Sequence, residues 1–170
     1  QALAHTYQTT ELNCRREYVQ HVFLSYFYQQ PQTDRVYFKG GTALRIIYRS
    51  PRFSEDLDFS AVPQDIRQIE QAILQTTEAM GKEGFRVRLE EAKQTSGGYL
   101  ARIGVGVFEH ALSILLQISF RDLSRNASLR HGDNQGEVVV IASDFVPSYV
   151  VVRLAQAQLV DEKIQALLDR

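Results

Sequence analysis

The apolar side chains of this chain recur at helical spacing in some segments and at every second position in others. Spacings of three and four residues predict amphipathic helices, and alternation predicts half-buried strands. The helices that this pattern predicts cover residues 11–29, 42–48, 64–80 and 155–170. The predicted strands cover residues 36–38, 56–60, 85–90, 99–108, 112–120, 138–141 and 149–152.

The order of these elements indicates the fold class. Helices and single strands alternate as far as Met80, after which strands follow one another through a Gly97-Gly98 turn and a polar loop over 121–135. Consecutive strands that alternate at a period of two are typical of an antiparallel meander. We therefore expect an α/β or α+β domain with a mixed, mostly antiparallel sheet flanked by helices.

Composition narrows the class of protein without identifying it. With 170 residues, 44% of them hydrophobic and 23% charged, the chain is long enough and apolar enough for one globular domain over 1–170. The formal net charge of −1 gives no general attraction to nucleic acid, so any basic surface must be local. The last residue, Arg170, falls inside a helical pattern, and we expect the domain to be truncated at its C-terminal end.

Two further features exclude classes of protein. A single cysteine, Cys14, excludes an intrachain disulfide framework and a multi-cysteine zinc site. The sequence has no apolar run of membrane-spanning length. A cytoplasmic protein with no membrane partner is the expectation.

Two glycines beside the second predicted helix suggest a phosphate site. In Phe38-Lys39-Gly40-Gly41-Thr42 a strand turns directly into a helix. Glycine lets a ligand approach the bare backbone, and the unpaired amides and positive dipole end of a helix start favour phosphate. The Thr42 hydroxyl can cap the helix or donate a hydrogen bond to a phosphate oxygen. The alternative is a tight turn that binds no ligand.

Two aspartates one residue apart suggest a metal site. Residues i and i+2 of a strand point to the same face, so Asp56 and Asp58 project together while Leu57 and Phe59 enter the core. Neighbouring carboxylates repel each other unless a cation neutralises them. Mg²⁺ is often held by one or two carboxylates together with substrate phosphates. The alternative is a solvated, acidic strand edge.

Together the two segments supply both halves of a site for a nucleoside triphosphate, since one grips phosphate and the other holds the metal that bridges phosphates. Arg45 would lie one helical turn after Thr42, on the same side, and Arg52 just ahead of the acidic strand. Either arginine could balance triphosphate charge or could be a surface residue. Ser54 is expected to contribute at most a hydrogen bond near the metal.

The segments FKGGTALR, residues 38–45, and RFSEDLDF, residues 52–59, closely resemble the abortive-infection toxin-like nucleotidyltransferases of the AbiEii/AbiGii group. That group belongs to the DNA-polymerase-beta-like nucleotidyltransferase superfamily. The superfamily motif is a helix-opening Gly-Gly or Gly-Ser followed by an acidic-apolar-acidic strand. The residues that take those places here are Gly40, Gly41, Asp56, Leu57 and Asp58.

The resemblance implies a polymerase-beta-like fold and an enzyme that moves a nucleoside monophosphate from an NTP to an acceptor and releases pyrophosphate. The implied acceptor is RNA, especially the 3′ end of tRNA, and the implied setting is a toxin–antitoxin or phage-defence pair with a cognate antitoxin. Asp56 and Asp58 would be catalytic ligands of Mg²⁺, or of Mn²⁺. The candidate nucleotide-binding residues are Gly40, Gly41, Thr42, Arg45 and Ser54.

A third segment extends the resemblance. LVDEKIQALLDR, residues 159–170, is similar to the family's third motif, whose lysine falls on Lys163. That lysine would contact phosphate or assist proton transfer as a catalytic residue. The alternative is a solvated lysine on the flank of a helix.

The sequence departs from the superfamily pattern at two places, and both departures allow a second, noncatalytic function. The superfamily often has a third carboxylate on a later strand, where this sequence has Gln117, an amide that binds Mg²⁺ poorly. The family's fourth motif, with an aspartate soon after the lysine helix, lies beyond Arg170. The alternative to an enzyme is therefore a noncatalytic member that binds a nucleotide or a partner protein.

Overall fold

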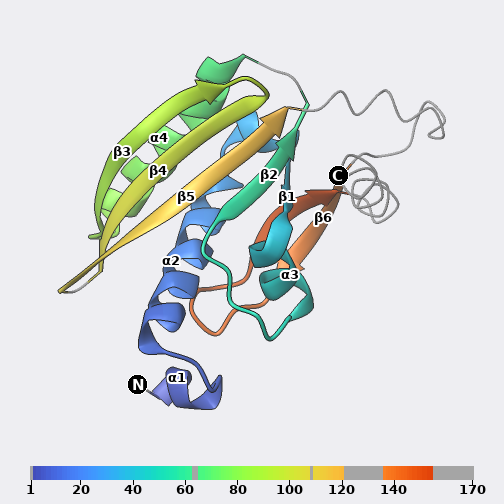
Figure 1. Ribbon diagram of the computed structural model, residues 1–170. Coiled ribbons are helices and arrows are strands. Elements are labelled where there is room, and N and C mark those ends of the chain that lie inside the picture. The colour runs from blue at the N-terminus through green and yellow to red at the C-terminus, as the bar shows by residue number, and fades with distance from the viewer. Residues whose placement is uncertain (1, 63–64, 108, 121–135, 155–170) are drawn as a thin grey trace.

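The computed structural model describes residues 2–62, 65–107, 109–120 and 136–154, which form one seven-stranded sheet with helices packed on it (Figure 1). The predicted helix over 155–170 and the predicted loop over 121–135 lie outside the described residues. No helix in the described ranges has the length and apolar character needed to cross a membrane.

The helices that the structure describes are α1 (Ala2–Thr6), α2 (Glu11–Phe27), α3 (Gly40–Tyr48) and α4 (Ile66–Lys82), with a 3-10 turn over Pro31–Thr33. The Thr10 side chain caps α2 by accepting a hydrogen bond from the Asn13 amide, and Asp65 caps α4 in the same way. At the end of α3, Arg49 adopts a left-handed backbone with φ of 55°, which stops the helix. The predictions of α2, α3 and α4 are confirmed.

The strands are β1 (Val36–Lys39), β2 (Leu57–Ala61), β3 (Arg86–Thr95), β4 (Gly98–Val107), β5 (His110–Phe120), β6 (Gly136–Ile141) and β7 (Tyr149–Leu154). Their order across the sheet is β3-β4-β5-β2-β1-β7-β6. The pairs β2/β5 and β1/β7 are parallel, and the other neighbours are antiparallel. The expected mixed, mostly antiparallel sheet is confirmed, and β1 and β2 lie in its interior.

One face of the sheet packs against α2 and α4, which lie behind the strands in Figure 1. The ring of Phe27 in α2 lies 5.3 Å from that of Phe59 in β2, centroid to centroid. The Tyr99 hydroxyl of β4 donates a hydrogen bond to Glu70 of α4. Phe59 and Tyr99 therefore point toward the helices. Because side chains alternate along a strand, Asp58 points to the opposite face.

α2 buries polar as well as apolar side chains, unlike an amphipathic helix that buries only its apolar face. Its apolar residues join the core, as predicted, but three polar residues are also buried: Glu17, Gln20 and His21, with exposed fractions of 7%, 2% and 4%. These three reach toward α3, the segment over 50–56 and β7, rather than toward the sheet alone. A buried polar group requires partners. α2 thus connects the core to the segments that carry the glycines and aspartates.

Candidate nucleotide and metal site

The glycine pair at the start of α3 packs directly against the acidic segment. A β-carbon placed on Gly40 would come within 2.2 Å of Asp58 Oδ2, and one placed on Gly41 within 2.8 Å of Ser54 Oγ. Neither distance is compatible with a real side chain. Gly40 also has a φ of 79°, a region that side chains rarely adopt. Gly40 is therefore required by the approach of the two segments, Gly41 packs tightly against the Ser54 side chain, and the turn and Asp58 meet at one place.

The start of α3 offers backbone amides to a ligand. Lys39 occupies the N-cap position in an extended conformation, and a lysine ammonium can only donate hydrogen bonds, so it cannot cap the amides of the first turn. α3 has nine residues, enough for a dipole with its positive end at Gly40. Amides and dipole together suit an anion such as phosphate.

Strand pairing fixes Asp58 beside this turn. In the antiparallel ladder of β1 and β2, Asp58 lies opposite Lys39, the residue before Gly40. Asp56 lies two residues earlier and, like Asp58, is partly exposed. Burial raises the pKa of Asp58, the charge on Asp56 raises it further, and the Lys39 ammonium partly offsets both. The two carboxylates therefore repel each other, as the sequence predicted.

Gln117, the residue expected at the place of the third carboxylate, lies on the strand next to Asp58. In the parallel ladder of β2 and β5, Asp58 pairs with Gln117, so the two side chains are neighbours on the face away from α2 and α4. Gln117 is exposed there. The amide thus stands directly beside Asp58, and its correspondence to the third carboxylate stays a prediction.

This donor set fits a hard divalent cation that shares its coordination with phosphate. The residues available are two carboxylates and a neighbouring amide, all oxygen donors, and Mg²⁺ commonly takes one or two carboxylates plus substrate phosphates. Among the described residues no group of three or more His, Cys, Asp and Glu side chains could hold a metal ion. In the described part of the chain, the ion pairs of Arg16 with Glu55 and of Arg45 with Glu17 leave both aspartates out.

Thr42 and Ser54 lie within the site, with specific partners. The Thr42 hydroxyl donates a hydrogen bond of 2.5 Å to the backbone carbonyl of Asp56, and the residue is 1% exposed. Ser54 lies against Gly41, and its carbonyl accepts a hydrogen bond from the Gln20 side chain. In this structure the Thr42 hydroxyl therefore fixes the acidic segment, which leaves the amides of the turn as the groups that could bind a phosphate.

Arg45 is on α3, as predicted, but its guanidinium is held by other groups. Its Nε lies 3.1 Å from Glu17 Oε1, its Nη1 donates a hydrogen bond to the Ser50 carbonyl, and it lies 4.0 Å from the ring centroid of Phe53. Burial raises the pKa of Glu17, and the Arg45 charge opposes that rise. The expectation that Arg45 balances triphosphate charge stays a prediction, and in this geometry the guanidinium already neutralises a buried carboxylate.

Sequence reasoning did not single out Gln20 or Glu17, although both support the site. The signal that could have found them is a polar stripe at Glu17, Gln20 and His21, spaced by three and four residues within a helix whose neighbouring positions are apolar. The other predicted catalytic residue, Lys163, lies outside the described residues.

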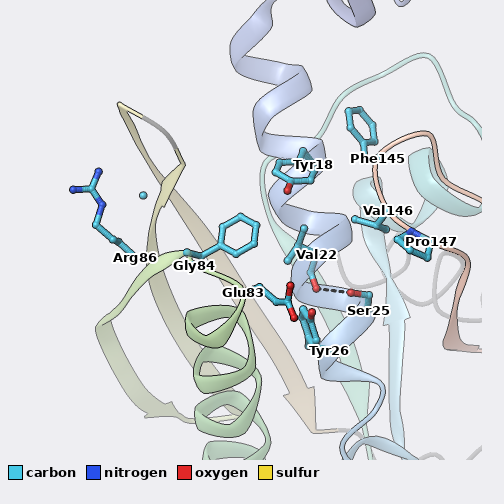
Figure 2. Close-up of a pocket in the computed structure, with 12 residues that line it drawn as sticks. Tyr18, Val22, Ser25, Tyr26, Glu83, Gly84, Arg86, Phe145, Val146 and Pro147 are labelled. Carbon is cyan, nitrogen blue, oxygen red and sulfur yellow. Dashed lines mark hydrogen bonds between the residues drawn. The ribbon is translucent and has the colours of Figure 1, made fainter.

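A cavity of about 690 Å³ lies beside α2 and contains none of the candidate site residues. Figure 2 shows Tyr18, Val22 and Tyr26 projecting from α2 into it, with Phe145 on one side, while Arg86 extends away. This cavity therefore does not mark the glycine turn as a binding site. The close approach of Gly40 to Asp58 is the feature that locates the candidate site.

Several solved structures resemble the fold, among them two from Helicobacter pylori. One, from H. pylori, is described provisionally as a nucleotidyltransferase; it has 18% sequence identity and a TM-score of 0.53, and the alignment covers 91% of this chain and 58% of that one. The other is JHP933 from Helicobacter pylori, with 22% identity, a TM-score of 0.51, and coverage of 91% of this chain and 56% of that one. The chain thus spans less than three-fifths of each protein. At these identities the likeness establishes the fold.

Among curated proteins none matches the chain. A family model does match the chain, and the matched residues include both the glycine turn and the acidic segment. The family model of the nucleotidyl transferase AbiEii toxin of type IV toxin–antitoxin systems matches residues 22–170. The chain belongs to this family of nucleotidyltransferase toxins.

Proposed function

We propose that this protein is a Mg²⁺-dependent nucleotidyltransferase that transfers a nucleoside monophosphate from an NTP to a hydroxyl of an RNA acceptor such as tRNA. In this role it is the toxin of a toxin–antitoxin pair that acts in phage defence, with a cognate antitoxin as partner. Membership of the AbiEii family supports the toxin role and the transferase class. The identity of the acceptor rests on the resemblance alone.

The observation that carries the proposal is the approach of Asp58 to Gly40, where a β-carbon would lie 2.2 Å from the carboxylate. This approach supports the proposal because the turn that would bind phosphate and an aspartate that would bind the metal lie against each other. A turn that served only to reverse the chain would have no need of an acidic strand against its α-carbon. A solvated acidic edge would have no need of a helix start beside it.

The residues supply binding and orientation, which dominate catalysis of phosphoryl transfer. The amides after Gly40 and the positive end of α3 hold the terminal phosphates of the NTP. Asp56 and Asp58 would hold the divalent cation, which would supply the charge that favours deprotonation of the acceptor hydroxyl and offsets charge on the pyrophosphate. The acceptor oxygen bonds to the α-phosphorus, the bond from that phosphorus to the pyrophosphate oxygen breaks, pyrophosphate leaves, and the hydroxyl proton passes to solvent water.

Labelled nucleotides offered with total tRNA test this function. The protein is incubated with each of the four labelled NTPs and Mg²⁺, beside the Asp56→Asn variant. The proposal predicts label on RNA with the native protein and at most about a hundredth of it with the variant. Equal labelling by both proteins would contradict the role of the aspartates.

A noncatalytic, nucleotide-binding member is the second candidate, and Gln117 beside Asp58 favours it. An amide there gives the site one negative charge fewer than a third carboxylate would. Nucleotide binding by a protein that labels no acceptor, with or without the Asp56→Asn change, would establish this second function.

A further inference from the structure

Asp56 stands just outside the hydrogen-bonded ladders that fix Asp58. The antiparallel register of β1 and β2 ends with Lys39 opposite Asp58. The parallel register of β2 and β5 begins with Leu57 opposite Leu116. The sheet therefore places one aspartate directly, and the other depends on whatever holds the chain before Leu57.

Two buried side chains from different helices hold that part of the chain. Gln20 of α2, 2% exposed, donates from Nε2 to the carbonyls of Ser54 and Glu55, at 3.0 Å each. Thr42 of α3, 1% exposed, donates to the carbonyl of Asp56 at 2.5 Å. Three consecutive carbonyls, from 54 to 56, are thus satisfied by side chains in place of a neighbouring strand.

We propose that Gln20 and Thr42 are positioning residues for Asp56 and fix its carboxylate relative to the turn at Gly40. This inference rests on the proposed function, since it assigns the two residues to the same metal site. Neither residue touches the metal or the nucleotide in this role. Each acts through the backbone of the acidic segment, as outer groups that orient a metal ligand do.

The arrangement is more specific than packing requires. A side-chain amide has two N–H donors, and Gln20 directs Nε2 at two adjacent carbonyls, so it fixes both the position and the rotation of the segment. An apolar residue could fill the same volume, but it would leave those carbonyls without donors. Thr42 adds the third contact from α3, the helix whose first backbone amides are proposed to bind phosphate.

A double-mutant cycle on Mn²⁺ affinity, followed by the electron paramagnetic resonance signal of unbound Mn²⁺, tests the inference. Thr42→Val removes the hydroxyl at nearly constant shape, and Gln20→Leu removes the amide. Each change should weaken Mn²⁺ binding about tenfold, and Thr42→Ser, which keeps the hydroxyl, should restore most of the affinity. In the Asp56→Asn background the same changes should have less than about a twofold effect, because the ligand they orient is gone.

Two controls separate positioning from general loss of structure. Thr76→Val removes a buried hydroxyl that donates to the Ala72 carbonyl of α4, remote from the site, and should leave Mn²⁺ affinity unchanged. Gln117→Ala retains both aspartates, so Thr42→Val should keep its full effect in that background. If Gln20→Leu fails to fold, the comparison of Thr42→Val with Thr42→Ser still tests whether the Thr42 hydroxyl positions Asp56.

The two possible failures can be told apart. If Thr42→Val and Asp56→Asn weaken Mn²⁺ binding by independent factors that multiply, the positioning role is wrong while the metal site stands. If Asp56→Asn leaves Mn²⁺ affinity unchanged, the metal site of the proposed function is wrong, and the positioning role fails with it.

Discussion

The carboxylate of Asp58 lies so close to the α-carbon of Gly40 that no side chain fits between them. This contact joins a strand end, a helix start and an acidic strand into one site. It also explains Gly40 by space as well as by backbone conformation, and Gly41 packs tightly against the Ser54 side chain.

Gly40→Ala should cost more stability than a positive φ alone explains. Gly84 is the matched control, because it has a φ of 91° but no atom of the described residues within 4 Å of an added β-carbon. We expect Gly84→Ala to lower the free energy of unfolding by about 1–2 kcal/mol and Gly40→Ala by about 2 kcal/mol more. Urea denaturation measures both, and equal losses would show that Asp58 is not in contact with the turn.

Gln117→Glu should strengthen the metal site. A carboxylate at this position would lie beside Asp58 in the β2/β5 ladder and add a charged oxygen donor. We expect Mn²⁺ to bind about tenfold more tightly, because affinity for hard cations rises with ligand charge. The same variant should melt at a lower temperature without metal, because three carboxylates repel one another. Unchanged Mn²⁺ affinity, by titration calorimetry, would mean that Gln117 is not part of the site.

The ion pair of Glu17 and Arg45 should stabilise the fold without taking part in NTP binding. Their side chains are 9% and 12% exposed, so removing one partner leaves a buried charge without its counterion. Glu17→Gln should cost about 3–5 kcal/mol of unfolding free energy, and the double change to Leu at 17 and Met at 45 should cost less. The double variant should still bind NTP with native affinity. Loss of NTP affinity in a folded double variant would show that Arg45 contributes to nucleotide binding.

His21 should make the fold sensitive to mild acid. Burial, with a smaller effect of the Arg45 charge, lowers its pKa from 6.5 to about 4, although Asp144 opposes the shift. Around the ring, Nδ1 lies 2.8 Å from the Tyr149 hydroxyl, and Nε2 lies 3.9 Å from Glu17. Between these pH values the unfolded chain binds the proton and the folded chain does not, so stability falls as pH falls.

The His21 effect should reach roughly 2–3 kcal/mol between pH 7.5 and pH 4.5. Denaturant titrations of the native protein and of His21→Gln at both pH values measure it. The difference between the two proteins isolates the histidine, because the carboxylates titrate alike in both. An identical loss of stability in the variant would show that His21 is protonated in the fold.

The elements of the fold were predictable from periodicity because each buries one regular face. Leu57 and Phe59 alternate with Asp56 and Asp58, and the structure places the apolar pair in the core and Asp58 on the opposite face. The position of Gln117 beside Asp58 was expected from the resemblance to the superfamily, and the strand register agrees with it. These features depend on local sequence and on the alternation of a strand.

The partners of Arg45 and Gln20 could not be predicted in the same way. Helical spacing correctly puts Arg45 one turn after Thr42, but it does not say which element faces that side of α3. The packing of α2 against both α3 and the acidic segment brings Glu17 to Arg45, 28 residues apart in sequence, and Gln20 to Ser54, 34 residues apart. Such contacts depend on tertiary packing. The role of Lys163 stays a prediction.

The central claim is that Asp56 and Asp58 hold a divalent cation beside the turn at Gly40. Melting curves with and without millimolar Mn²⁺, for the native protein, Asp56→Asn and Asp58→Asn, test it most directly. The raised pKa of Asp58 means that its charge opposes folding, so Asp58→Asn should melt above the native protein when metal is left out. Mn²⁺ should then raise the melting temperature of the native protein and leave both variants almost unchanged. An equal rise in all three proteins would contradict the claim.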